Sequence, residues 1–328
     1  MKCLRNIGMS PLETRDDALI DVLYNVKNIA IFQEDIYIGS GEQLIVWDKY
    51  GKFKRVLSKK GNDPQSYLHF NHFMIWPNGD LSIASPIEIV TYSNAHQFIN
   101  KKRCENVGYI EAITLLNDSL YIIKCMPTPE QLRYRIINHH TGAIINSYDS
   151  IINCNRYISS FTNSFERYEG HIISHGYQSN DILECTLDSS KIRYKINVDN
   201  RIPPAGFYTQ EGKEGMQLIQ EEAEKGYIGH IPDYVESKET ILLSFKGKRE
   251  DLNGIALIDK KDGNARVLEN IKFDDNFRWL PKQFFSLDEG WCAMLMYPED
   301  VLKKEEFARR FPGLDEESNP VLFIGKLR

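Results

Sequence analysis

The sequence lacks a strong excess of charge and has no long hydrophobic run. Its 40 basic and 46 acidic residues give a formal net charge of −6. A dedicated DNA- or RNA-binding protein needs a basic face that neutralises phosphates, so we expect no nucleic-acid partner. Strongly polar residues interrupt each hydrophobic run within about ten positions, whereas a membrane-spanning helix needs about 20 apolar residues. We therefore expect no membrane span.

Cysteine is scarce, and the common catalytic motifs are missing. The six cysteines include no Cys-x-x-Cys pair, which argues against zinc and thiol redox sites. Three of them, Cys125, Cys185 and Cys292, lie in apolar runs where we expect buried thiols. The sequence contains no G-x-S-x-G elbow, phosphate-cradling loop or dinucleotide fingerprint. We therefore name no catalytic residue, no metal ligand and no cofactor.

The histidines form no convincing metal motif. His171 and His175 stand in HIISH, which has zinc-like spacing but lies in a predicted strand and lacks an activating glutamate. His69 and His72 form a pair without a third nearby ligand. We expect these side chains to pack in the core or to line a channel.

The N-terminal stretch MKCLRNIGMSPLETRDD contains no hydrophobic segment of the kind found in secretory signal peptides. As written, the sequence therefore predicts no export signal. We interpret residues 1–17 as an N-terminal tail and place the folded domain at residues 18–328.

Short runs rich in Ile, Val, Phe, Tyr and Leu recur along the chain, separated by turns such as PNGD at Pro77 to Asp80. This pattern is typical of an all-β protein. Helical periodicity occurs only near residues 212–225 and 299–310, and both segments are highly charged. We interpret these segments as helical insertions.

The strands recur in groups of four. Tight turns between the first two strands of each group fall near Glu34, Asn78, Asn117, Glu169, Lys238 and Glu289. They define six units spaced by roughly 40 to 70 residues, and propeller blades have four strands and a similar period. We therefore predict a six-bladed β-propeller with four antiparallel strands in each blade. Two stacked β-sandwiches are the alternative.

The last unit is one strand short. Its predicted strands are Gln283 to Ser286, Trp291 to Tyr297 and Val321 to Lys326, after which the chain ends. An N-terminal strand could complete this blade and close the ring. The apolar run Ala18 to Tyr24 is the predicted closing strand.

Two stretches resemble a known propeller family. Residues 46–83 contain a D-x-x-G-K turn and then a loop similar to G-x-G-P-x-E-Y, and residues 315–328 end in an acidic segment followed by N-P-V-L. The matching loop positions are Gly61, Pro64 and Tyr67, and the departures are Asp63 and Ser66. Both stretches resemble the NHL-like six-bladed β-propellers of exported proteins and lipoproteins from gut-dwelling Gram-negative bacteria. The resemblance implies a periplasmic or cell-surface location, which the N-terminus as written does not support.

The predicted strand order places the short turns on one face of the ring and the long connections on the other. The long connections are Lys59 to Phe70, Met126 to Arg133, Asp199 to Ile231 and Pro298 to Pro320. Long loops on a rigid scaffold are where binding sites usually lie. We expect this face to carry ligand-binding side chains from Arg156, Tyr157, His175, Tyr177, Arg278 and Trp279.

Arginine and aromatic side chains suit sugars, peptides and acidic groups, because aromatic faces stack on apolar surfaces and guanidinium groups hold carboxylates. The sequence therefore favours a noncatalytic binding or scaffold propeller with a protein, peptide or glycan partner. The alternative is a hydrolase or lyase acting on glycan or peptide in the central channel, since propellers host both kinds of function.

Overall fold

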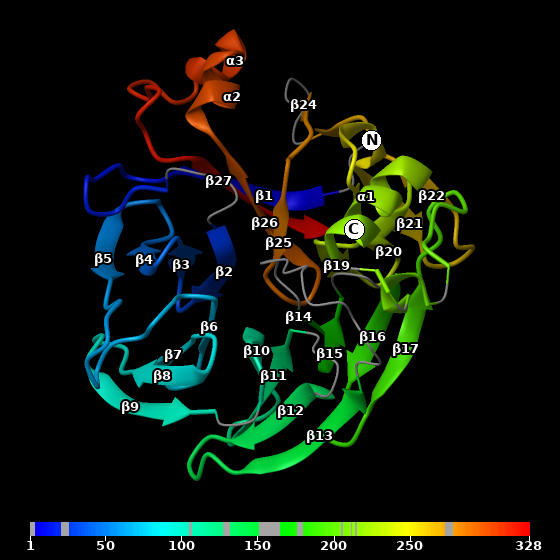
Figure 1. Ribbon diagram of the computed structural model, residues 1–328. Coiled ribbons are helices and arrows are strands. Elements are labelled where there is room, and N and C mark those ends of the chain that lie inside the picture. Colours follow the sequence, from blue (N-terminus) through cyan, green and yellow to red (C-terminus); the bar gives the residue numbers. More distant parts are fainter. Residues whose placement is uncertain are drawn as a thin grey trace.

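The computed structural model describes residues 4–20, 26–104, 107–126, 132–150, 165–175, 180–204, 206–210, 212–213, 215–272 and 278–328. Six antiparallel sheets are arranged around a central axis as the blades of a propeller (Figure 1). This arrangement confirms the predicted all-β, six-bladed propeller. No helix in these ranges is long and apolar enough to cross a membrane.

The first three blades each contain four strands, ordered along the chain from the centre of the ring outward. Blade 1 consists of β2 (Val26–Phe32), β3 (Asp35–Ser40), β4 (Gln43–Trp47) and β5 (Phe53–Leu57). Blade 2 consists of β6 (His72–Ile75), β7 (Leu81–Ala84), β8 (Glu88–Tyr92) and β9 (Phe98–Arg103). Blade 3 consists of β10 (Ile110–Leu115), β11 (Leu120–Cys125), β12 (Leu132–Asn138) and β13 (Ile144–Ser150).

The next blades follow the same order, with an interruption in blade 5. Blade 4 consists of β14 (Phe165–Tyr168), β15 (His171–Ser174), β16 (Asp181–Cys185) and β17 (Ser190–Lys195). The inner position of blade 5 is divided between two strands that both pair with β20. Blade 5 consists of β18 (Ile228–His230), β19 (Tyr234–Glu236), β20 (Thr240–Gly247), β21 (Gly254–Asp259) and β22 (Ala265–Val267).

Blade 6 joins the two ends of the chain. From the centre outward it consists of β25 (Phe284–Ser286), β26 (Trp291–Met296), β27 (Val321–Leu327) and β1 (Leu4–Pro11). A separate two-stranded sheet, formed by β23 (Ile271–Lys272) and β24 (Arg278–Trp279), lies in the connection from blade 5 to blade 6.

The predicted N-terminal closing strand is confirmed, but the predicted segment was wrong. The closing strand is β1, which pairs antiparallel with β27. Residues 18–20 form no strand, and Ala18 and Ile20 instead pack into the core between blades 6 and 1. Residues 21–24 lie outside the described ranges. An outer strand buries little apolar surface, so a sequence of mixed polarity such as LRNIGMSP can form β1. The apolar residues 18–20 instead pack between two blades.

The core consists of six apolar clusters, one at each interface between neighbouring blades. Between blades 1 and 2, for example, Tyr37 and Leu44 pack with Phe73 and Val90. Each blade is covered on both faces by its neighbours, and for this reason the sequences of its inner strands are continuously apolar. The expected burial of Cys125, Cys185 and Cys292 is confirmed.

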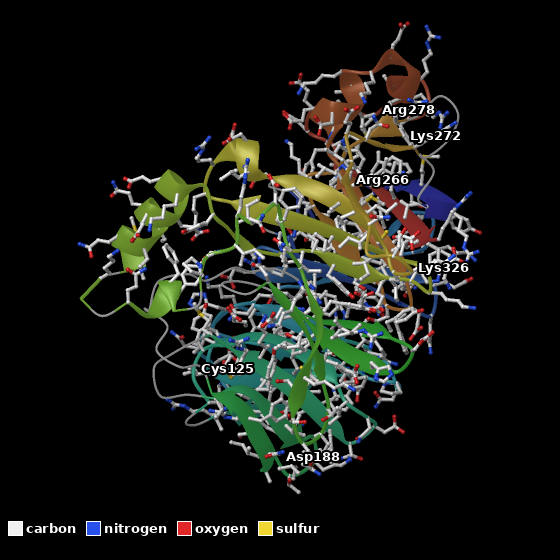
Figure 2. All side chains as sticks on the ribbon, turned by 90° about the vertical axis from the view of Figure 1, so that its right-hand side faces the viewer. Cys125, Asp188, Arg266, Lys272, Arg278 and Lys326 are labelled. Atoms are coloured by element: carbon white, nitrogen blue, oxygen red, sulfur yellow. The ribbon has the colours of Figure 1, made fainter. Side chains whose placement is uncertain are left out.

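The two faces of the ring differ in their connections. One face, here called the short-turn face, carries tight turns such as residues 33–34 and 169–170, where Gln33, Glu34 and Glu169 adopt positive φ. The opposite insertion face carries the longer connections 58–71, 196–227 and 297–320. Figure 2 shows helix α1 on the same side as Cys125, with Lys326 on the other side.

The helices of the described ranges lie in connections of the insertion face. Connection 196–227 contains η2 (Phe207–Thr209) and α1 (Gly215–Lys225), and connection 297–320 contains α2 (Pro298–Leu302) and α3 (Glu305–Ala308). A short helix, η3 (Glu250–Leu252), lies between β20 and β21. Helices α1, α2 and α3 overlap the two segments with helical periodicity, whereas η3 lies outside both.

Candidate functional site

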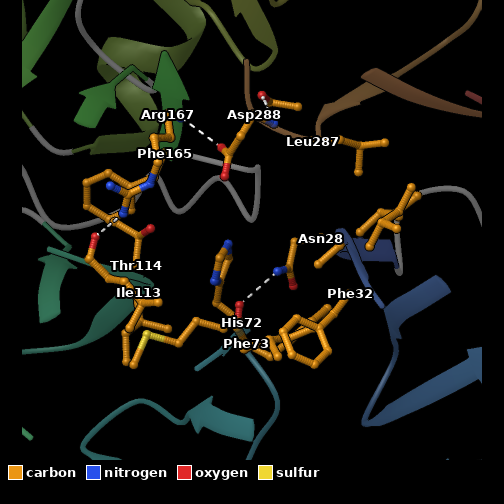
Figure 3. Close-up of a pocket in the computed structure, with 17 residues that line it drawn as sticks. Asn28, Phe32, His72, Phe73, Ile113, Thr114, Phe165, Arg167, Leu287 and Asp288 are labelled. Carbon is orange, nitrogen blue, oxygen red and sulfur yellow. Dashed lines mark hydrogen bonds between the residues drawn. The ribbon is translucent and has the colours of Figure 1, made fainter. Parts of the chain in front are cut away.

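A cavity of about 210 Å³ lies in the central channel (Figure 3). The inner strands β2, β6, β10 and β14, together with β25 and its turn, line it. Its wall is mixed, with polar and apolar surface in similar amounts, and its apolar residues include Phe32, Ile113, Phe165 and Leu287. The wall residue Ile31 is 42% exposed, so the cavity is open to solvent.

Arg167 is the cationic side chain of the cavity wall. Its guanidinium Nη2 donates a hydrogen bond to the carbonyl oxygen of Leu115 in β10. Its backbone nitrogen donates to Oδ1 of Asp288 (2.8 Å), and its carbonyl accepts from the backbone nitrogen of Glu289 (2.7 Å). These bonds fix Arg167 between blades 3, 4 and 6. Among the described residues, its guanidinium forms no ion pair.

Asp288 is the carboxylate of the cavity wall. It lies in the turn between β25 and β26, with φ of 65°. The side chain is exposed to the channel, yet the surrounding blades desolvate it and raise the pKa of its carboxyl. The hydrogen bond from the backbone of Arg167 opposes this rise only in part.

Polar side chains also bridge the inner strands of neighbouring blades. Asn28 Nδ2 donates to the carbonyl oxygen of Phe73 (2.9 Å), and Asn71 Nδ2 donates to that of Ile110 (2.7 Å). Figure 3 shows the ring of His72 pointing into the cavity. The open edges of inner strands need such partners, since buried backbone groups are costly when unsatisfied.

Buried titratable groups gather at the insertion-face end of blades 3 to 5. Lys124 Nζ donates to the carbonyl oxygen of His175 (2.6 Å), and His175 Nδ1 donates to that of Ile231 (3.0 Å). Burial lowers the pKa of His175 to about 3. Burial and the nearby Lys246 hold the pKa of His230 well below its ordinary value. Both histidines are therefore neutral at pH 7.

Asp233 belongs to the same region. Its Oδ2 accepts a hydrogen bond from Ser244 Oγ (2.6 Å), and burial raises the pKa of its carboxyl to about 6. In the part of the chain that the structure describes, no three His, Cys, Asp or Glu side chains converge in a way that could hold a metal ion.

Glu166, beside Arg167 in β14, is a buried acid at the interface between blades 4 and 5. It is 2% exposed, and its Oε1 accepts a hydrogen bond from the backbone nitrogen of Glu236 (2.9 Å). Burial raises the pKa of Glu166 well above its ordinary value, and the charges of Asp288 and Glu236 add to this rise. Glu166 therefore holds its proton far above the pH at which an exposed glutamate loses it.

We expect Glu166→Gln to stabilise the protein at pH 8 by about 1 to 3 kcal/mol and to have little effect at pH 4. The folded protein retains the proton that the unfolded chain releases above about pH 4.3, so wild-type stability falls as pH rises towards the raised pKa. Glutamine is neutral and keeps an acceptor for the Glu236 nitrogen. Urea unfolding at pH 4, 6 and 8 measures the effect.

Glu184→Gln is the matched control, because ion pairs with Lys191 and Arg193 outweigh burial and lower the pKa of Glu184. This change should cost stability at pH 8 and little at pH 4. Parallel pH profiles for the two variants would contradict the assignment of Glu166 as a protonated acid.

The predicted ligand residues are separated in the described ranges. His175 is buried between blades 4 and 5, with its ring 5.7 Å from that of Tyr234. Trp279 is buried between blades 5 and 6, with its ring 5.8 Å from that of Phe323. Arg278 is exposed, and its carbonyl oxygen accepts a hydrogen bond from Lys304. The remaining predicted residues, Arg156, Tyr157 and Tyr177, lie outside the described ranges.

Sequence reasoning missed Arg167, Asp288, Glu166 and Glu236. The available signal was the position of charged residues inside short inner strands, such as FERY in β14, directly before a tight turn. A charged side chain at such a position must meet a polar partner on a neighbouring blade. The sequence does not name that partner.

Comparisons with known proteins support the fold and leave the chemistry open. The structure is similar to that of a "Putative exported protein" from Bacteroides fragilis, with a TM-score of 0.76, 13% identity and coverage of 99% of this chain and 96% of that one. It is also similar to a DUF4221 family member from Bacteroides vulgatus, with a TM-score of 0.57, 10% identity and coverage of 99% and 97%. No curated protein matches the chain.

A family model covers nearly the whole chain. It spans residues 4–326, from the first residue of β1 to the penultimate residue of β27, and so includes every blade. The chain belongs to the DUF4934 family, which is described as a domain of unknown function.

Proposed function

We propose that the protein is a noncatalytic binding propeller that presents its insertion face to a protein, peptide or glycan partner. The observation that carries this proposal is the asymmetry of the ring. The long connections 58–71, 196–227 and 297–320 begin and end at the insertion face, whereas tight turns form the connections of the other face. A rigid scaffold with long loops on one face is a common design for recognition.

The insertion that contains α1 is anchored to the ring, which favours a preformed surface. Leu218 and Glu222 of α1 are buried. Tyr208 approaches β18 so closely that an added Cβ at Gly229 would clash with its hydroxyl oxygen. Met216, on the outer side of α1, is 68% exposed. The insertion thus presents apolar surface from a fixed position, and preorganisation reduces the entropic cost of binding.

We propose that Arg278, Arg156, Tyr157 and Tyr177 contact the ligand, and that the buried His175 and Trp279 support the surrounding surface. Arg278 supplies an exposed guanidinium on β24. Guanidinium groups hold carboxylates, and tyrosine rings stack on sugars and peptides. This assignment favours acidic glycans and acidic peptides among possible partners.

The test is binding of the purified chain to glycan and peptide arrays, followed by titration of each hit. We expect Arg278→Ala and Arg156→Ala to weaken a genuine hit by about tenfold, the typical effect of a lost charge-assisted hydrogen bond. Lys261→Ala, in the exposed turn between β21 and β22 on the short-turn face, is the control. If only Lys261→Ala lowered the affinity for a hit, the partner would bind the short-turn face and the proposal would be overturned.

The second candidate is a hydrolase or lyase that acts in the channel. The observation in its favour is the raised pKa of Asp288, which lines the channel cavity, since catalytic acids have such shifts. Mass spectrometry of each array hit after incubation with the protein distinguishes the two functions. Cleaved product that disappears with Asp288→Asn would establish the enzyme and overturn the noncatalytic proposal.

We also infer an extracytoplasmic location at the periplasm or cell surface, as in the NHL-like exported propellers that the sequence resembles. The name of the similar Bacteroides fragilis protein supports this inference. Immunodetection in fractionated cells of the source organism tests it, and a purely cytoplasmic signal would refute it.

A further inference from the structure

Among the described residues, the wall of the channel cavity contains one guanidinium and one carboxyl group, and these two side chains form no ion pair with each other. Arg167 and Asp288 both line it, from blades 4 and 6. The bond between them uses the backbone nitrogen of Arg167, while the guanidinium binds the Leu115 carbonyl. Neither side chain forms an ion pair within the described ranges. Burial raises the pKa of Asp288, and the backbone hydrogen bond and the charge of Arg167 oppose this rise only in part.

The apolar walls and the volume define the rest of the ligand. A cavity of about 150 Å³ lined by apolar side chains holds benzene. The channel cavity, at about 210 Å³, therefore has room for a somewhat larger molecule. Its apolar lining residues include Phe32, Ile113, Phe165 and Leu287. Figure 3 shows Arg167 and Asp288 at the same end of this space.

We propose that the channel binds a free α-amino acid with an apolar side chain. The carboxylate of the ligand lies at Arg167, its ammonium group at Asp288, and its side chain against the apolar walls. The proposal goes beyond the binding role of the insertion face, because it concerns a different part of the molecule and a small ligand.

A zwitterion fits this cavity better than a ligand with a single charge. A carboxylate alone would leave Asp288 beside a second negative charge, and an amine alone would place a cation near Arg167. Opposite charges in a confined site are stabilised when each has a partner. The guanidinium geometry matches a carboxylate in particular. The exposure of Ile31 on the wall provides access from solvent.

Isothermal titration with four probes tests the charge requirement. Leucine carries both charges, isocaproate lacks the ammonium, isoamylamine lacks the carboxylate, and leucinamide replaces the carboxylate with an amide. We expect saturable binding of leucine at one site and binding of the other three at least about tenfold weaker. Equal affinity for isocaproate, isoamylamine or leucinamide would overturn the proposal, as would the absence of saturable leucine binding.

Two conservative variants test the two contacts separately. Arg167→Gln should weaken leucine about 10- to 100-fold and leave isoamylamine unchanged. Asp288→Asn should weaken leucine similarly and leave isocaproate unchanged. Asparagine keeps an acceptor for the Arg167 nitrogen and tolerates the positive φ of position 288. Unchanged leucine affinity in both variants would contradict the proposed contacts.

Further variants separate binding from folding. Arg266→Gln, on the exposed strand β22, should bind leucine as the wild type does. Ile31→Trp adds bulk to an exposed position of the cavity wall and should abolish leucine binding without disturbing the core. If Arg167→Gln does not fold, Asp288→Asn and Ile31→Trp decide the question. Full leucine affinity in Ile31→Trp would place the ligand outside the channel.

Discussion

Deletion of residues 1–11 is expected to lower the stability of the whole ring. This truncation removes β1, which pairs with β27 and completes blade 6. It also removes Leu4, which is fully buried in the core between blades 5 and 6. Loss of a large buried aliphatic side chain alone costs about 2 to 5 kcal/mol. We expect a lower urea midpoint and concentration-dependent association through the exposed edge of β27.

Two point variants and a synthetic peptide show whether the truncated protein is less stable because the pairing of β1 with β27 is lost. Leu4→Ala should cost about 2 to 5 kcal/mol, whereas Arg5→Ala, at an exposed position of the same strand, should change stability by less than about 0.5 kcal/mol. A synthetic peptide of residues 1–11 should raise the urea midpoint of the truncated chain by strand addition. An unchanged midpoint after truncation would show that β1 does not close the ring.

Replacement of Glu236 by glutamine should cost about 3 to 5 kcal/mol at pH 7. Glu236 is fully buried at the interface between blades 4 and 5. Its carboxylate accepts hydrogen bonds from Arg193 (2.9 and 3.0 Å), Lys260 (2.6 Å), Tyr194 (3.0 Å) and Tyr234 (2.8 Å). Glutamine cannot balance the charges of Arg193 and Lys260, which would remain partly buried. Urea unfolding measures the loss.

The pH dependence of this effect follows from the pKa of Glu236. Burial opposes the shift, but hydrogen bonds from Arg193, Lys260 and Tyr234 lower the pKa. The stabilisation is therefore complete above about pH 4.3 and is lost as the pH falls through the lowered pKa. The difference between wild type and Glu236→Gln should narrow in that acid range.

An exposed ion pair provides the control for Glu236. Glu305 and Arg309 in and beside α3 are 79% and 73% exposed, and Glu305→Gln should cost no more than about 0.5 kcal/mol. If Glu236→Gln cost no more than this, the buried network would not hold blades 4 and 5 together.

The sequence alone determined the number of blades, the order of their strands and the difference between the two faces. Each of these features can be predicted from local patterns, namely apolar runs, turn residues and the lengths of connections. The closing strand escaped this reasoning because LRNIGMSP has little apolar character. A strand at the outer edge of a blade is defined by its partner, β27, more than by its own side chains.

Only the tertiary structure decided which charged residues meet. Arg167 and Asp288 are more than a hundred positions apart in the sequence, and the ring brings them to one cavity. The same holds for Arg193 and Glu236 on neighbouring blades. Local patterns predict that a charged side chain in an inner strand needs a partner, because burial of an unpaired charge is costly. The identity of that partner depends on how the blades pack around the axis, and local sequence patterns do not predict this packing.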